Sequence, residues 1–126
     1  MKKAMILLVG ILFSAGLAFG QSSVKQAFEG ERGSAFTALF DSNVDTYVMG
    51  KEKRLSKGDA VKVMDTFFAS HTVQGVKMVH SGESRGQGSN YEIYELNTNK
   101  NVYRVYVYYK TDGGKKLISE LRIEDN

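Results

Sequence analysis

The chain has 126 residues, a formal net charge of +3 and no cysteine. The lack of cysteine excludes disulfides, thiolate catalysis, lipid attachment at a processed cysteine and Cys-ligated zinc. The length is typical of a single small protein domain, and the modest charge does not suggest the concentrated basic stripe of a nucleic-acid-binding protein.

The first 20 residues, MKKAMILLVGILFSAGLAFG, have the pattern of an export signal. Two lysines precede an apolar run over 4–13, and Ala18 and Gly20 supply the small residues needed before a cleavage site. An uncleaved anchor is the alternative. A spanning helix needs about 20 apolar residues, however, and glycine and serine interrupt the apolar run. We therefore predict cleavage after Gly20, which leaves one domain at 21–126.

The charge of the mature chain is nearly balanced. Two of the 17 basic residues lie in the signal, so 15 basic and 14 acidic residues remain in the last 106 (126 minus 20). The basic run KEKR at 51–54 contains a glutamate and is predicted to be a solvated loop. We expect no nucleic-acid partner, no stable membrane anchor after cleavage, and a periplasmic or extracellular location.

The segment 22–40 has interrupted helical spacing. Gly30 and Gly33 break the apolar pattern, which predicts two short helices meeting at a bend, with one kinked helix as the alternative. Ser34 is predicted to cap the second helix. The side chains predicted to be core are Phe28, Phe36, Leu39 and Phe40.

A capped helix gives the clearest local signal, over 56–68. Ser56 precedes Asp59 by three residues, a variant of the capping box, and apolar side chains then recur at helical spacing up to Phe68. A short strand is predicted before it over 44–50, flanked by turns at 41–43 and 50–53. The strand's two faces carry Val44, Thr46 and Val48 on one side, and Tyr47 and Met49 on the other.

After Gly75 the sequence predicts four antiparallel strands, because apolar alternating segments are separated by GQG, NTNK and TDGG. The predicted order is a broken helix, one strand, one helix and four strands. Helices early and strands late indicate an α+β domain, with the N-terminal helices packed on an antiparallel sheet.

The last two strands have one apolar and one mixed face. A three-residue loop at 112–114 would join the odd positions of 101–110 and 115–125 into one core face. On the even face, Arg104 would then lie opposite Arg122, with Glu120 diagonal to it. Three interpretations of the even face stay open: a tyrosine-shielded surface, a ligand platform, or a homodimer interface built on Arg104, Tyr106 and Tyr108.

The sequence offers no catalytic or metal-binding constellation. His71 lies near the end of the capped helix, which predicts a surface role. His80 shares strand parity with Val76 and Met78, and is predicted to be a packed or edge histidine, with a general base as the alternative. The glycines of 81–89 lack the strand-to-helix setting of a phosphate loop. We predict no catalytic residue, no metal and no cofactor.

The pattern resembles the nuclear-transport-factor-like (cystatin-like) α+β cone and, more narrowly, a family of small exported bacterial domains of unknown function. The stretches that carry the likeness are Phe40–Glu52, Ser56–Phe68, Val79–Gly82, Tyr103–Tyr106 and Leu117–Ile123. The resemblance implies a strongly bent sheet wrapped around helices. Its superfamily includes ketosteroid isomerases, small-molecule binders and dimer modules, so the fold alone does not choose a function.

The functional expectation is an exported, non-enzymatic domain that binds a small apolar ligand or an envelope protein, alone or as a homodimer. Isomerase-like relatives place a carboxylate or histidine inside the cone, whereas the inward positions predicted here are mostly Phe, Leu, Val and Tyr. A ligand cavity is expected between Tyr47, Phe68 and the sheet. The alternative is a small hydrolase or isomerase that uses His80 or a buried carboxylate.

Overall fold

The computed structural model describes residues 23–83 and 90–126, so the predicted export signal lies outside the described residues. No helix in this part of the chain is long and apolar enough to cross a membrane. The elements in chain order are α2 (Ser23–Gly30), the 3-10 helix η2 (Gly33–Phe36), β1 (Phe40–Val48), β2 (Lys51–Ser56), α3 (Lys57–Ser70), β3 (Val73–Glu83), β4 (Asn90–Thr98), β5 (Val102–Asp112) and β6 (Lys115–Asp125).

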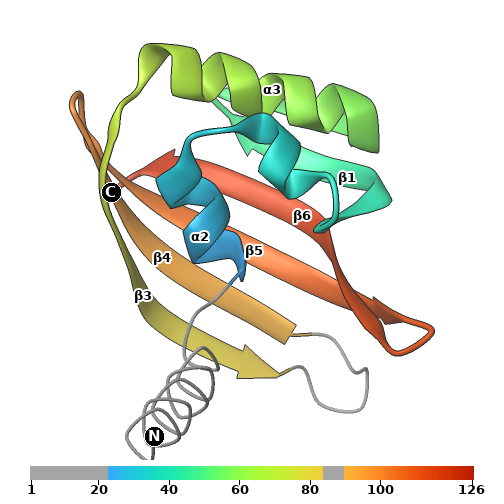
Figure 1. Ribbon diagram of the computed structural model, residues 1–126. Coiled ribbons are helices and arrows are strands. Elements are labelled where there is room, and N and C mark those ends of the chain that lie inside the picture. Colours follow the sequence, from blue (N-terminus) through green and yellow to red (C-terminus); the bar gives the residue numbers. More distant parts are fainter. Residues whose placement is uncertain (1–22, 84–89) are drawn as a thin grey trace, which may run out of the picture.

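The strands form one curved sheet in the order β2-β1-β6-β5-β4-β3. All neighbours are antiparallel except β1 and β6, which run parallel. Figure 1 shows α2, η2 and α3 over one face of the sheet, which we call the inner face. The opposite face is the outer face. This arrangement confirms the predicted α+β class.

The structure contains a strand that the sequence did not predict. β1 begins at Phe40 and includes the predicted turn at 41–43, and the expected loop 51–54 lies in β2. Only Met49 and Gly50 form the turn between them, with φ values of 53° and 78°. The side chains of β2 are solvent-exposed, except for that of Leu55, which is half-buried. Because β2 therefore lacks an apolar alternation, its pairing with β1 is what makes it a strand.

The N-terminal helices are confirmed as two short pieces meeting at a bend. α2 ends at Gly30, and Glu31 has a φ of 54° before η2 begins. The predicted Ser34 cap is wrong, because Arg32 precedes η2 without a side-chain cap and Ser34 lies within the helix. The cap of α3 is confirmed: Ser56 Oγ accepts a hydrogen bond from Asp59 N at 3.3 Å.

An aromatic cluster joins these helices to the sheet. Phe28 meets Phe36 edge-on at 5.2 Å between ring centroids, and Phe36 stacks on Phe40 at 5.4 Å. All three rings are fully buried, as predicted, while Leu39 is half-buried. Burial of aromatic rings on this scale supplies much of the stability of a small domain without disulfides.

The β5–β6 hairpin has a different register from the predicted one. Its loop is the pair Gly113–Gly114, since Asp112 pairs with Lys115, and an irregularity beyond Tyr108 shifts the pairing by one residue. The predicted three-residue loop is therefore wrong. The β-bulge restores the predicted odd-numbered core face up to Tyr108, where Val105 pairs with Ile123 and Val107 with Leu121, all buried. Nearer the loop the prediction is wrong, because Tyr109 pairs with the buried, even-numbered Ile118.

The bulge also changes the partner of Arg104. Arg104 lies opposite Glu124 on β6 and opposite Glu95 on β4, so the predicted pairing with Arg122 does not occur. Arg122 instead donates from Nε to Glu124 at 2.7 Å. Opposite charges across neighbouring strands replace the unfavourable like-charge pair.

Candidate functional site

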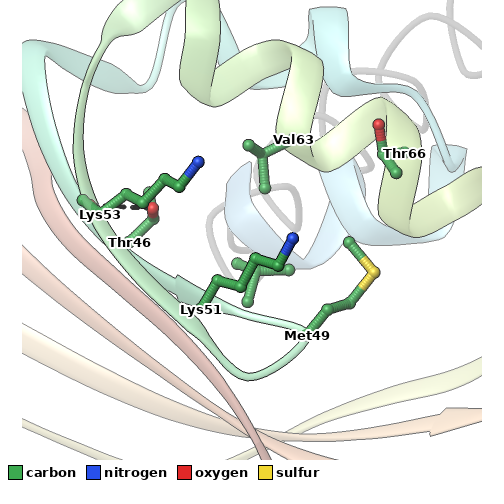
Figure 2. Close-up of a pocket in the computed structure, with 7 residues that line it drawn as sticks. Thr46, Met49, Lys51, Lys53, Val63 and Thr66 are labelled. Carbon is green, nitrogen blue, oxygen red and sulfur yellow. Dashed lines mark hydrogen bonds between the residues drawn. The ribbon is translucent and has the colours of Figure 1, made fainter.

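A pocket of about 370 Å³ lies between α3 and the β1–β2 hairpin. Its size is within the range of small-molecule sites, about 300–1,000 Å³. Figure 2 shows side chains from both strands, the turn and the helix converging on this space. The lining residues are Thr46, Val48, Met49, Lys51, Lys53, Val63 and Thr66.

Strand and helix periodicity bring these side chains together. Lys51 and Lys53 pair with Val48 and Thr46, which are buried on the inner face, so both lysines lie on the pocket side of β2. On α3, Val63 and Thr66 are three residues apart and share one face of the helix. The floor and walls are thus mostly hydrocarbon, and the lysines extend along one side (Figure 2).

The hydroxyl groups of the pocket are already used as donors. Thr46 Oγ1 donates to the Lys53 carbonyl at 3.0 Å, and Thr66 Oγ1 donates to the Lys62 carbonyl at 3.1 Å. Each threonine therefore presents its methyl group or an accepting oxygen to a ligand. The two lysine ammonium groups are the strong donors that the pocket offers.

The charged side chains on the outer face of β2 have partners of opposite charge, whereas those on the pocket face have none in the described part of the chain. On the outer face, Arg54 forms an ion pair with Asp45 at 3.0 Å, and Glu52 lies 3.9 Å from Arg122. On the pocket face, neither Lys51 nor Lys53 forms an ion pair with any residue that the structure describes. The pocket therefore has an uncompensated positive charge.

Met49 forms the lip of the pocket in an unfavourable backbone conformation. Its φ of 53° lies in the left-handed region, which favours glycine and asparagine. Its side chain is 45% exposed, so no core contact explains the choice of methionine in this turn. Strain of this kind is concentrated at functional sites.

The two residues predicted to line a ligand cavity do not share one. Tyr47 lies on the outer face, with its ring 4.6 Å from the Arg122 guanidinium carbon. Phe68 is buried on the other side of the sheet, 5.9 Å from the Phe28 ring. Strand alternation separates them, since Tyr47 is adjacent to the buried Val48. The expected cavity between Tyr47 and Phe68 is therefore wrong as a geometric prediction.

His80 lies outside the cone. An irregularity between Met78 and His80 inserts one extra residue into β3, so that His80 pairs with Ile93 on the outer face. Its Nε2 lies 2.9 Å from the hydroxyl oxygen of Tyr91. The alternative in which His80 is a general base inside the cone is wrong.

His71 is buried, contrary to the predicted surface role. Only 8% of the residue is exposed, and its ring stacks on Phe67 at 4.2 Å. Its Nδ1 lies 2.9 Å from the Phe67 carbonyl oxygen, and its Nε2 lies 3.0 Å from the Tyr103 hydroxyl. The imidazole therefore links the end of α3 to β5.

Sequence reasoning missed a carboxylate on the inner face. Tyr94 and Tyr109 both donate to Glu92 Oε1, each at 2.7 Å. Burial, and then the hydrogen bond to Glu92, raise the pKa of Tyr109 far above its ordinary value. The sequence pattern could have indicated this, because Glu92 lies two residues before the buried Tyr94 on β4 and alternate residues of a strand share one face. Two phenols on one oxygen identify Glu92 as an acceptor that satisfies core tyrosines.

The predicted interface residues do lie together on the outer face. Arg104, Tyr106 and Tyr108 follow one another at alternate positions of β5, and the Tyr108 ring lies 6.4 Å from that of Tyr91 on β4. Tyr108 is 39% exposed. Arg104 Nε is shielded from solvent yet has no hydrogen-bond partner in the described residues. Figure 1 shows no described helix over this face.

Comparisons with solved structures return the same architecture. A DUF4783 family protein from Bacteroides uniformis is 25% identical, with a TM-score of 0.76 over 82% of this chain and 94% of that one. An NTF-2 like protein of unknown function from Silicibacter pomeroyi is 11% identical, with a TM-score of 0.59 over 100% and 99%. A domain with a cystatin-like fold from Nostoc punctiforme is 10% identical, with a TM-score of 0.65 over 81% and 70%.

These likenesses agree with the fold that the sequence resemblance implied. No match is found among curated proteins. The model of DUF4783, a domain of unknown function, matches residues 21–124. The chain therefore belongs to the DUF4783 family and has the NTF2-like, cystatin-like α+β fold.

Proposed function

We propose that this protein is an exported, non-enzymatic binding domain that takes a small, largely apolar ligand into the pocket between α3 and the β1–β2 hairpin. The observation that carries the proposal is an open hollow of about 370 Å³ walled by Val48, Met49 and Val63. Pockets of this kind, mostly apolar with a few polar groups, are the usual small-molecule sites. The signal pattern of the first 20 residues supports a periplasmic or extracellular location.

The residues around the pocket support binding rather than catalysis. None of the seven lining residues is an aspartate, glutamate or histidine, so the pocket has no group suited to acid–base chemistry near neutral pH. The inner-face carboxylate Glu92 already accepts two tyrosine hydrogen bonds, and His80 is on the outer face. The alternative of a hydrolase or isomerase therefore has no reactive group at this site.

Binding is expected to depend on the free volume beside Val63. The neutral apolar probe N-phenyl-1-naphthylamine should bind with a rise in fluorescence, and Val63→Trp should weaken binding at least tenfold by filling the pocket. The measurement is a fluorescence titration of protein purified from cells that express the full 126-residue chain. Val102→Trp, at a 37% exposed position on β5, is the matched control.

A probe that gives no fluorescence change with the wild-type protein would contradict the proposal. So would equal binding by the Val63→Trp and Val102→Trp variants. Thermal unfolding of both variants shows whether each remains folded at the titration temperature, so that a loss of binding is assigned to the pocket rather than to unfolding.

The outer face supports a second proposal, that two copies of the chain associate through it. Arg104, Tyr106 and Tyr108 belong to residue types enriched at interfaces. The face carries both signs of charge, because Arg104 lies between Glu95 and Glu124, so the same surface on a second copy is electrostatically compatible. Arg104 Nε also lacks a hydrogen-bond acceptor in the described residues.

The double substitution Tyr106→Ala and Tyr108→Ala is expected to convert a dimer into a monomer. Removal of two aromatic side chains from the centre of an interface typically costs about 2 kcal/mol or more each, enough to raise the dimer dissociation constant several hundredfold. Light scattering after size-exclusion chromatography measures the mass, and Lys62→Ala on α3 is the control. A wild-type protein that stays monomeric at high concentration would discard the dimer.

A further inference from the structure

The charge of the pocket indicates the chemical class of its ligand. We infer that the ligand is an amphiphilic anion, an apolar chain or ring that ends in a carboxylate, with the carboxylate held by Lys51 and Lys53. This inference rests on the proposed binding function of the same pocket. It adds the head group that the apolar walls alone do not specify.

The first step of the argument is the placement of the two ammonium groups. Lys51 and Lys53 are two residues apart on one face of β2, so their backbones are separated by about 6.6 Å and their flexible stems can converge. Like charges at that separation repel, and no described carboxylate compensates them. A bound anion between them removes the repulsion and adds two charge-assisted hydrogen bonds.

The second step is the number of donors available. Thr46 and Thr66 use their hydroxyl hydrogens on backbone carbonyls, and no arginine lines the pocket. The remaining strong donors are two ammonium groups, one for each oxygen of a carboxylate. Phosphate sites usually add an arginine fork, and no arginine lines this pocket.

The third step is the apolar lip. Met49 keeps a long thioether side chain at a turn position where asparagine or glycine would relieve the backbone. A ligand with an apolar body would cover this exposed side chain together with Val48 and Val63. Methionine is suited to that contact because its flexible, polarizable chain adapts to varied apolar partners.

A competing explanation is that the lysines protect the free edge of the sheet. β2 is an edge strand, and lysine on an edge strand discourages pairing with other chains. That explanation does not require the lysines to bind any ligand. The two explanations therefore give different results when both charges are removed.

The experiment compares decanoate with decan-1-ol as competitors of N-phenyl-1-naphthylamine. The wild-type protein should bind decanoate more tightly than decan-1-ol, and this preference should weaken with added salt. The double variant Lys51→Gln and Lys53→Gln should lose about tenfold in decanoate affinity relative to its affinity for the neutral probe, as expected for two partly exposed ion pairs. Lys77→Gln with Lys100→Gln is the control of equal charge change.

The outcomes separate the inference from the proposed function. Probe binding that Val63→Trp abolishes, with decanoate affinity equal in the wild-type protein and the Lys51/Lys53 double variant, would overturn the anionic ligand and leave the pocket standing. Self-association of that double variant without any loss of decanoate affinity would assign the lysines to edge protection and also overturn the inference. Failure of both probe and decanoate to bind would refute the proposed function and the inference together.

Discussion

Replacement of Glu92 by alanine is expected to lower the free energy of unfolding by about 2–6 kcal/mol. The substitution removes the oxygen to which Tyr94 and Tyr109 both donate, and loss of the acceptor of a buried hydroxyl costs about 1–3 kcal/mol each. Tyr94 is fully buried and Tyr109 is 8% exposed, so both phenols belong to the hydrophobic core. Urea unfolding followed by circular dichroism measures the change.

Glu92→Gln separates the acceptor from the charge. Glutamine keeps an oxygen at the same length of side chain, so both tyrosines can still donate to it, and the loss should be about half that of the alanine variant or less. Equal losses in the two variants would show that the negative charge is what matters. A Glu92→Ala protein as stable as the wild type would show that the cluster contributes nothing to the fold.

Glu92 is also the residue on which an enzymatic interpretation would have to depend. It is the carboxylate that the inner face of β4 presents, and the sequence-based alternative required such a group. Both tyrosines donate to its Oε1, which gives Glu92 a structural role as the acceptor of two phenols of the core. The expected loss of stability follows from this geometry.

The sequence was sufficient to predict the elements that carry a clear periodicity. The capped helix α3 and the four C-terminal strands follow from apolar spacing of 3.6 and 2, respectively. The odd-numbered core positions Val105, Val107 and Leu121 were also predicted correctly. Their register was not, because a bulge inserts one residue without any hydropathy signature.

The pocket itself could not be predicted, because it depends on β2. A strand that begins with four charged side chains has no apolar alternation to detect, and the sequence KEKR was therefore predicted to be a solvated loop. Once β2 pairs with β1, its lysines lie beside Thr46 and Val48 and face α3. A bulge in β3 hid the position of His80 in the same way.

The substitution Gly33→Ala is expected to destabilise the fold by about 2.5–6 kcal/mol. Gly33 N donates to Asp65 Oδ1 at 2.7 Å, and an added Cβ would collide with the Val61 carbonyl oxygen and the Asp65 carboxyl group. The Val61 oxygen belongs to the backbone of α3 and cannot swing away. Overpacking costs about 1–3 kcal/mol, and loss of a hydrogen bond to a charged group adds about 1.5–3 kcal/mol.

The collision would act on the aromatic core through η2. This short helix carries Phe36, whose ring contacts both Phe28 and Phe68, so displacement of η2 opens the cluster between the helices and the sheet. Gly58→Ala is the matched control, because nothing lies within 4 Å of its added Cβ and alanine favours helix, which should raise stability by about 0.5–1 kcal/mol. In chemical denaturation, Gly33→Ala should therefore lower the free energy of unfolding and Gly58→Ala should raise it. A Gly33→Ala protein as stable as the wild type would mean that η2 does not contact α3 as closely as the structure places it.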